Sequence, residues 1–317
     1  MLKGLNIKKN DSAIVSFESC DDAGVYKLGN NLLVQTVDII TPIVDDPFTF
    51  GKIAAINALS DVYAMGGTPI TALSILMYDC KIESSIIKEI LNGAIEEFNN
   101  EDCALLGGHT VEDSEIKLGF SITGIITNGK IYRNNTLNED NLLILTKPIG
   151  TGIISTALKG ALVDEPALLA ATGYMTTSNK KASEIMKKYN VSACTDVTGF
   201  SLAGHLYEMA NYSNISIYID VKSIPIIDGT LKYASMGLIP GGAYRNKDFL
   251  VPFVDINNSV DEQFIMPLFD PQTSGGLLIG VDPSDGENLL KDLKKNGHFC
   301  NIIGKTVSRQ NKLIIFT

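Results

Sequence analysis

The residues of this chain whose types and positions could do chemistry are aspartates beside turns and small residues. A carboxylate among apolar residues is costly to bury unless it is paired or bound to a metal. Proteins usually hold Mg²⁺ with one or two carboxylates plus substrate phosphates. The candidates are Asp21 and Asp22 (CDDAGVY), Asp38 (QTVDIITP), Asp45, Asp46, Asp61 (NALSDVYAMGG), Asp196 (TDVTGF) and Asp270 (DPQTSGG). Each alone is better explained as a cap or turn residue, but the set favours a Mg²⁺–nucleotide phosphate site.

Three segments place glycine with serine or threonine, two of them beside one of these acids. They are GGHT (107–110), DVTGFS (196–201) and QTSGG (272–276). Such backbone can approach a phosphate closely and donate N–H groups to it. His109 could equally be a packed turn residue or a phosphate contact, whereas His205, inside LAGHLYEM, is better explained as a structural helix residue.

Other familiar chemistries have no matching pattern. The sequence has no GxxxxGK[ST], no HExxH and no CxxC, which excludes a P-loop and the usual zinc sites. GTGIIS (150–155) has Ser155 at the third glycine position of a dinucleotide fingerprint, so a tight turn is the better interpretation. The five scattered cysteines are best explained as buried hydrophobes, except Cys20, which could be exposed beside Asp21.

The elements that must position these residues follow from hydrophobic spacing. In the first half, strands are expected at 12–17, 32–39, 70–78, 103–108, 116–127 and 141–148, and helices at 48–65 and 84–98. In the second half, helices are expected at 151–160, 175–189, 200–211 and 285–296, and strands at 215–221, 275–281 and 313–316. The chain becomes helix-rich after Pro148, which predicts one domain over 1–148 and a second over 149–317. Strands and helices mix without strict alternation, so both domains are expected to be α+β.

Composition narrows the function classes. The chain has 317 residues, 45% of them hydrophobic, and a formal net charge of −10, which is globular usage rather than disorder. An acidic surface repels nucleic acid and anionic membranes, and cations must screen any phosphate substrate. The N-terminus does not read as a signal peptide, and no apolar run reaches the ~20 residues that span a bilayer. We expect a soluble cytoplasmic protein that binds neither nucleic acid nor membrane.

Several longer motifs resemble one family, in order and over nearly the whole chain. They are TVDIITPIVDDPFTFGKIAAINALSDVYAMGGTPI (36–70), LLGGHTVEDSE (105–115), TGIIT (123–127), LTKPIGTG (145–152), ACTDVTGFSLAGHLYEM (193–209), PGGAYRN (240–246) and FDPQTSGGLL (269–278). With these motifs the chain resembles the selenophosphate synthetases (selenide, water dikinases). NALSDVYAMGG with TDVTGF and DPQTSGG is highly specific within the wider superfamily of aminoimidazole ribonucleotide synthetase and thiamin-monophosphate kinase.

The resemblance implies a fold, a reaction and an assembly. The fold would be the two-domain aminoimidazole ribonucleotide synthetase-like α+β fold, with mixed sheets packed with helices, and a homodimer would form through the N-terminal domains. ATP and several Mg²⁺ ions would lie in a cleft, and a monovalent cation is a further candidate without an assigned position. The family converts ATP, selenide and water into selenophosphate, AMP and orthophosphate.

The resemblance also carries site residues over by motif. The Mg²⁺ ligands would be Asp22, Asp61 and Asp196, and Asp38 and Asn57 would help to hold the nucleotide and its metals. The segment Ser19, Cys20 and Asp21 would run along the nucleotide, and Gly108, His109 and Thr110 would contact it from the neighbouring subunit.

One family element does not match any segment. Family members carry a Gly-rich segment with a nucleophilic Cys or selenocysteine and a Lys, some tens of residues before the DDA motif. The resemblance therefore predicts that these catalytic residues lie upstream of Met1, that the chain is N-terminally truncated, and that it is inactive or impaired as given. Cys20 is no substitute, because it adjoins the DDA motif. Two alternatives stay open: another ATP-dependent kinase of the superfamily, and a non-catalytic nucleotide-binding protein of selenium metabolism.

Overall fold

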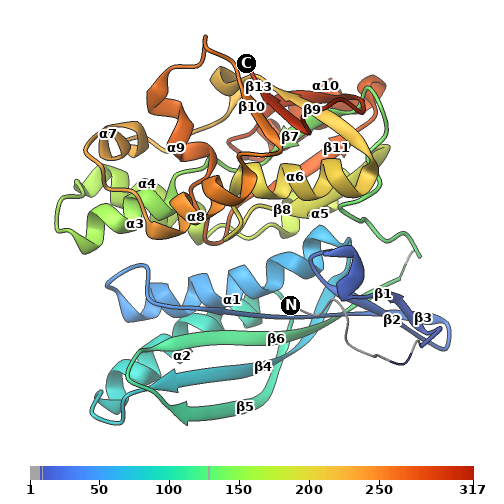
Figure 1. Ribbon diagram of the computed structural model, residues 1–317. Helices are drawn as coiled ribbons and strands as arrows, with labels where there is room; N and C mark the ends of the chain where they lie inside the picture. The colour runs from blue at the N-terminus through green and yellow to red at the C-terminus, as the bar shows by residue number, and fades with distance from the viewer. Residues whose placement is uncertain (1–7, 9, 128) are drawn as a thin grey trace.

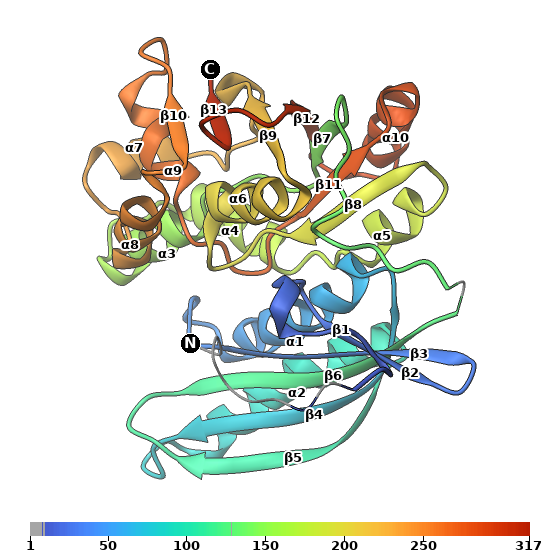
Figure 2. The same cartoon turned by 45° about the vertical axis from the view of Figure 1, so that its right-hand side comes forward.

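The computed structural model describes residue 8, residues 10–127 and residues 129–317. The segment MLKGLNIKK (1–9), whose sequence is typical of the end of a helix, lies outside this description, Lys8 excepted. The described chain forms two units, each built on one mixed sheet, and Figures 1 and 2 show the second unit stacked on the helices of the first. Both units combine strands with helices, as the sequence predicts.

The first sheet has six strands in the order β1-β2-β3-β6-β4-β5. Their bounds are β1 (Ala13–Val15), β2 (Gly24–Leu28), β3 (Asn31–Ile40), β4 (Thr68–Tyr78), β5 (Ala104–Glu112) and β6 (Lys117–Ile126). Neighbours are antiparallel except β4 and β5, which are parallel because a helix connects them. Side chains alternate between two faces, so Val34, Thr36 and Asp38 of β3 face the helices, whereas Val37 and Ile39 face away.

Two helices, α1 (Pro47–Ala64) and α2 (Ser84–Asn100), cover one face of this sheet. Asp46 starts α1 by accepting a hydrogen bond from the Thr49 N–H at 2.8 Å, and Pro47 occupies the first turn. Gly66, at φ 79°, follows the end of the helix. The two helices approach so closely that a Cβ on Gly51 would lie 1.7 Å from the Ile90 carbonyl oxygen.

Helix α1 is buried over almost its whole length because it packs against the first sheet on one side and the second unit on the other. Apolar residues such as Ile53 and Leu59 occupy the sheet side of the core. Asn57, Ser60 and Asp61 are also buried. A helix in this position can present polar groups to a site between the units.

The second sheet has seven strands in the order β10-β13-β9-β12-β7-β11-β8. Their bounds are β7 (Leu142–Leu145), β8 (Val191–Asp196), β9 (Ile215–Ile219), β10 (Val254–Ile256), β11 (Leu277–Val281), β12 (Asn301–Ser308) and β13 (Ile314–Phe316). The β10-β13-β9 pairings are parallel and the others antiparallel. This strand order places the end of β8 beside the start of β11.

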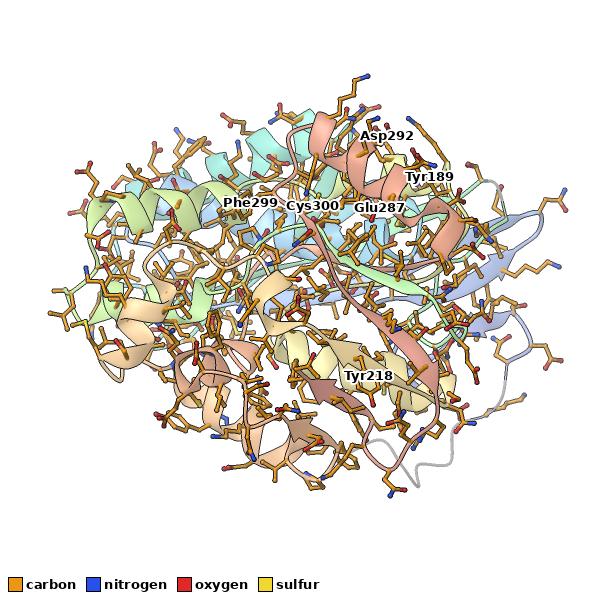
Figure 3. All side chains as sticks on the ribbon, turned by 90° about the horizontal axis from the view of Figure 1, so that it is seen from above. Tyr189, Tyr218, Glu287, Asp292, Phe299 and Cys300 are labelled. Atoms are coloured by element: carbon orange, nitrogen blue, oxygen red, sulfur yellow. The ribbon has the colours of Figure 1, made fainter. Side chains whose placement is uncertain are left out.

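Helices pack on both faces of the second sheet. Their bounds are α3 (Thr151–Lys159), α4 (Glu165–Met175), α5 (Lys180–Met186), α6 (Ser201–Ser213), α7 (Thr230–Ser235), α8 (Gly241–Leu250), α9 (Ile265–Leu268) and α10 (Pro283–Lys295). Leucines of α6 pack on one face and leucines of α10 on the other. Figure 3 shows Tyr189, after α5, beside Asp292 of α10, to which its hydroxyl donates a hydrogen bond. Among the described residues no helix is both long and apolar enough to cross a membrane.

Two sequence expectations differ from the structure in detail. The predicted helix 175–189 is wrong, because α4 ends at Met175 and α5 covers only Lys180–Met186; Thr176–Asn179 form the connection. The predicted division at residue 148 leaves β7 in the first domain, yet β7 hydrogen-bonds to β11 and β12. Strand pairing therefore favours a division in the connection between β6 and β7.

Candidate functional site

Four aspartates from separate elements come together between the two units. Asp38 lies near the end of β3, Asp61 lies on α1, Asp22 precedes β2, and Asp196 is the last residue of β8. Asp196 raises the pKa of each of the other three carboxyl groups. Asp22, Asp38, Asp61 and Asp196 are called the acid cluster below.

Asp61 is the member whose pKa all three of the others raise. It is 7% exposed, and the Thr36 hydroxyl of β3 donates a hydrogen bond to its carboxylate. Burial raises the pKa of Asp61 well above its usual value, and the charges of Asp196, Asp38 and Asp22 raise it further. The helix therefore holds this carboxyl group in a place where its ionised form is disfavoured.

Asp22 and Asp196 are held by hydroxyl groups. Thr195 donates to Asp22 Oδ1 at 2.5 Å, and burial followed by the charge of Asp196 raises the pKa of Asp22 well above its usual value. Burial raises the pKa of Asp196 to about 6, and this rise is limited by a hydrogen bond from Ser60 and by the nearby Lys147 ammonium. Neither hydroxyl neutralises a carboxylate charge.

Asp38 borders a cavity of about 280 Å³ between the units. The Asn57 side chain donates to Asp38 Oδ2 at 2.8 Å, and burial together with Asp196 raises the pKa of Asp38 to about 7. The cavity is lined by Asp38, Ile39, Ile40, Asn57, Thr198, Gly199, Pro271, Gln272 and Thr273. Residues of the TDVTGF and DPQTSGG segments thus line the same cavity as Asp38, the member of the acid cluster that borders it.

The acid cluster fits a cation. Asp22 Oδ2 and Asp196 Oδ2 are buried and accept no hydrogen bond from the described residues. A bound cation would supply the missing partners and offset the mutual repulsion. In the described part of the chain no group of three or more His, Cys, Asp or Glu side chains is placed so that it could hold a metal ion. A cation here would need water and phosphate oxygens in addition to the carboxylates. The donor set therefore suits Mg²⁺, which completes its shell with water and phosphate oxygens.

The segment before Asp22 lies at the edge of the cluster. Asp21 is turned away, because its carboxylate accepts hydrogen bonds from Arg133 Nε at 3.1 Å and from the Asn134 N–H at 2.9 Å. Cys20 is exposed, as the sequence suggested, with its Sγ 3.3 Å from the Tyr212 hydroxyl. Ser19 ends a short 3₁₀ helix (Phe17–Ser19), and its side chain lies outside the described part. Their predicted nucleotide contacts stay predictions.

The structure does not bring Gly108, His109 and Thr110 to the acid cluster of the same chain. They lie on β5, the exposed edge strand, and β6 and β4 separate β5 from β3. Figure 1 shows β5 at the edge of the first sheet that is remote from the second unit. A role for these residues at a nucleotide therefore requires the cluster of another copy of the chain.

Sequence reasoning missed the residues that hold the aspartates. Thr36, Ser60 and Thr195 contact the acid cluster, and none carries a spacing signal of its own. The DPQTSGG motif marks loop 270–276, and the structure adds that polar groups of this loop bind α1 and α3. Gln272 Oε1 accepts from the Gly150 and Thr151 N–H groups, and the Ser274 N–H donates to Asn57 Oδ1.

Comparison with known proteins places these features in a family. The model of the AIR synthase related protein N-terminal domain matches residues 20–126, and that of the C-terminal domain matches residues 138–316. Selenide, water dikinase of Pelobacter propionicus is 44% identical over 99% of this chain and 91% of its own length. Selenide, water dikinase of Caldanaerobacter subterraneus is 46% identical over 96% of this chain and 89% of its own.

Among solved structures, hydrogenase maturation protein HypE in complex with ATP superposes with a TM-score of 0.66 at 15% identity, over 92% of this chain and 81% of its own. That likeness supports the fold alone. The matches confirm the predicted aminoimidazole ribonucleotide synthetase-like fold and the predicted family. With two complete domain matches and relatives above 40% identity along its length, the chain belongs to the selenide, water dikinase family.

Proposed function

We propose that the chain is a selenide, water dikinase that makes selenophosphate from ATP, selenide and water and releases AMP and orthophosphate. ATP has three phosphoryl groups and AMP retains one, so one phosphoryl group passes to selenide and the other to water. Both transfers proceed through anionic phosphoryl groups, and their catalysis depends on positioning and on neutralising charge. The site must therefore collect cations beside a nucleotide-sized space.

The observation that carries the proposal is the acid cluster with two unpartnered carboxylate oxygens. Asp22, Asp61 and Asp196 would hold Mg²⁺, which when bound neutralises the triphosphate and polarises its phosphoryl groups. Asp38 and Asn57 border the adjoining cavity and would orient the nucleotide and its metals. The Ser19–Asp21 segment lies at the edge of the cluster, where it would flank the nucleotide.

A homodimer is the second part of the proposal, and the outer face of the first sheet supports it. Val37, Ser121 and Leu73 are neighbours in register on the face that α1 and α2 leave uncovered. Val37 and Leu73 are about half exposed, at 55% and 48%. Neighbouring exposed apolar side chains on one sheet face are typical of an interaction surface.

The same face includes His109. Ile39, Gly119, Ile75 and His109 form one row across β3, β6, β4 and β5, so His109 lies on the outer face beside apolar neighbours. If the partner copy covers this face, its nucleotide comes within reach of Gly108, His109 and Thr110. This explains why those residues lie away from the acid cluster of their own chain.

We place this activity in the cytoplasm, and the state of the cysteines supports that compartment. Cys20, Cys80, Cys103, Cys194 and Cys300 are all unpaired. Unpaired thiols in a chain of this kind are typical of a reducing environment.

The test of the activity is nucleotide turnover with and without selenide in the presence of Mg²⁺, with products followed by ³¹P NMR. We expect AMP, orthophosphate and selenophosphate in equal amounts, only when selenide, Mg²⁺ and the family's Cys- or selenocysteine-bearing segment are all present. Release of ADP instead of AMP would show another kinase of the superfamily. Mg–ATP binding without any AMP would show a nucleotide-binding protein without this chemistry.

The dimer is tested by Leu73→Lys. A charge on the outer sheet face is expected to shift the chain from dimer to monomer in analytical ultracentrifugation, because a lysine would have to be desolvated at the interface. Lys159, at the end of α3, offers the matched control Lys159→Leu, which is expected to leave the mass unchanged. A monomeric parent chain, or a dimer that survives Leu73→Lys, contradicts this part of the proposal.

A further inference from the structure

Loop 270–276 joins the second unit to α1 through the backbone of one residue. The Ser274 N–H donates to Asn57 Oδ1 at 2.8 Å, and the Ser274 carbonyl accepts from Lys147 Nζ at 2.8 Å. The Ser274 hydroxyl donates to the Met175 carbonyl at 2.7 Å. All three groups of Ser274 that can form hydrogen bonds are therefore used, each toward a different element.

Lys147 is an unusual partner for this loop. Its side chain is 3% exposed, and its ammonium donates to two neutral carbonyl groups, those of Thr177 at 2.6 Å and Ser274 at 2.8 Å. No carboxylate of the described residues lies within ion-pair distance of it. Burial lowers the pKa of Lys147 to about 7, and the Asp196 and Glu97 charges oppose that change. Burying a cation in this way is costly, so the arrangement calls for a role beyond packing.

The contacts continue from Lys147 to the acid cluster without a gap. Lys147 fixes the Ser274 carbonyl, the Ser274 N–H fixes Asn57 Oδ1, and Asn57 Nδ2 donates to Asp38 Oδ2 at 2.8 Å. Because the amide oxygen of Asn57 already accepts from Ser274, its NH₂ group must face Asp38. The orientation of the Asn57 amide is thus decided by the loop.

The loop itself has little freedom to move. Ser274 has φ 50°, a left-handed conformation that a residue with a Cβ adopts only when its surroundings impose it. Gly276 packs so closely on the segment after β7 that a Cβ would lie 2.4 Å from the main-chain nitrogen of Lys147. The Lys147 ammonium holds the carbonyl group of Ser274 in this conformation through its hydrogen bond.

We propose that Lys147 is a positioning residue for the nucleotide site, acting on Asp38 through Ser274 and Asn57. The proposal rests on the proposed function for the identity of the ligand, Mg–ATP, but the chain of contacts exists without it. Lys147 does not line the cavity, and its hydrogen bonds go to two main-chain carbonyl groups. Its charge also lowers the pKa of Asp196, so the test must separate that direct effect from the effect through the loop.

The test is a double-mutant cycle on Mg–ATP affinity, measured by isothermal titration calorimetry on the folded protein. Lys147→Met keeps the length of the side chain and removes its charge, and is expected to weaken Mg–ATP binding roughly tenfold, the size expected for a lost charged hydrogen bond. Lys147→Met combined with Asn57→Ala is expected to weaken binding no more than Asn57→Ala alone, because both act through one contact chain. Fully additive effects would overturn the proposal.

Lys180→Met is the matched control. Lys180 also links the two units, through an ion pair with Glu101 at 2.9 Å, but it does not contact loop 270–276. It is expected to lower the melting temperature and to leave Mg–ATP affinity unchanged. If Lys147→Met behaves like Lys180→Met, the lysine is structural only and the proposal is wrong. If Lys147→Met does not fold, Lys147→Gln takes its place in the same cycle.

A second measurement separates this inference from the proposed function. Hydrogen exchange at the Ser274 amide, read at single-residue resolution without nucleotide, is expected to be at least about tenfold faster in Lys147→Met than in Lys180→Met. Equal rates in the two variants would overturn the contact chain. A parent chain that binds Mg–ATP but makes no AMP with selenide, even with the family's Cys- or selenocysteine-bearing segment supplied, would refute the proposed function. The double-mutant cycle on Mg–ATP affinity would still test the role of Lys147.

Discussion

Helix α1 is bordered by two groups of buried carboxylates that differ in their partners. On one side, Glu101 is 7% exposed, accepts from the Tyr63 hydroxyl at 2.6 Å and pairs with Lys180 Nζ at 2.9 Å. On the other side, Asp61 and the other carboxylates of the acid cluster have hydroxyl and amide groups as hydrogen-bond partners. None of these carboxylates forms an ion pair with a described residue. Both groups are buried, so burial alone does not distinguish them.

The difference lies in whether the protein supplies the opposite charge. A buried carboxylate with a lysine and a phenol is a completed interaction that holds two elements together. A buried carboxylate with unpartnered oxygens is incomplete, and it lowers stability until a cation arrives. We infer that the acid cluster keeps its unpartnered oxygens, although they lower stability, because the cation that neutralises them belongs to the substrate complex.

Asp61→Asn should give the largest effect. It removes one charge and nearly no volume, so Mg–ATP affinity is expected to fall at least about a hundredfold, since several kcal/mol of charge stabilisation is lost. The melting temperature of the ligand-free protein is expected to stay the same or rise, because repulsion with Asp22, Asp38 and Asp196 is relieved. Calorimetric titration and a thermal melt of the same sample measure both.

Loss of affinity and gain of stability in one variant is the outcome that distinguishes a binding group from a structural one. The mass in analytical ultracentrifugation is the control, and it is expected to match the parent chain. Unchanged Mg–ATP affinity in Asp61→Asn would refute the ligand role of Asp61. A large fall in melting temperature would place Asp61 with Glu101 among the structural carboxylates.

The sequence predicts this site in part, because aspartates in apolar surroundings are rare and each lies in a recognisable segment. The motifs of Asp22, Asp61 and Asp196 are enough to assign these three residues to one site. The helix that carries Asp61 can also be predicted from the sequence. Their partners cannot be predicted in this way. Thr36 and Thr195 are ordinary strand residues in sequence, and the alternation of β3 and β8 alone brings their hydroxyls to the cluster.

The fold is predictable to a similar degree. Long periodic segments such as α1 and α2 agree with their spacing, whereas short elements such as β2, β8, β10 and α7 are missed because only tertiary pairing stabilises them. The place of β7 is unpredictable from local pattern, since it pairs with β11 and β12, which lie far along the chain. The hydrogen bonds of the Lys147 ammonium cannot be predicted from the local sequence either, because the two carbonyl groups that accept them lie in distant loops.

Asp270→Asn tests a buried carboxylate that lies between these two groups in its partners, because one of its oxygens accepts hydrogen bonds and the other has no partner among the described residues. Asp270 accepts from the Gly152 N–H at 3.1 Å and from Gln272 Nε2 at 2.8 Å, yet its Oδ1 is unpartnered. Burial raises the pKa of Asp270 from 3.8 to about 7. The folded state therefore holds a proton that the unfolded state loses, so this group lowers stability as pH rises from about 4 to about 7.

Asp270→Asn removes that titration. Relative to the parent chain, the variant is expected to gain roughly 2 kcal/mol of unfolding free energy between pH 5 and pH 8, measured by urea denaturation across that range. Asp38, whose pKa is also near 7, titrates in both proteins and cancels in the difference. If the difference in unfolding free energy between the variant and the parent chain does not change with pH, the raised pKa of Asp270 is contradicted. A fall in Mg–ATP affinity would show that Asp270 acts together with the acid cluster.

Glu101→Gln should give the smallest effect and the opposite pattern to Asp61→Asn. The amide keeps an acceptor for the Tyr63 hydroxyl but loses the ion pair with Lys180, whose side chain is 39% exposed and therefore rehydrates. We expect a loss of about 1 kcal/mol of unfolding free energy and no change in Mg–ATP affinity. Lys180→Met removes the same pair but leaves the buried Glu101 carboxylate without its cation, so it should lower stability more than Glu101→Gln does. An affinity change in Glu101→Gln without one in Lys180→Met would mean that Glu101 reaches the nucleotide site through Tyr63 and α1, and the contrast between the two groups of carboxylates would then fail.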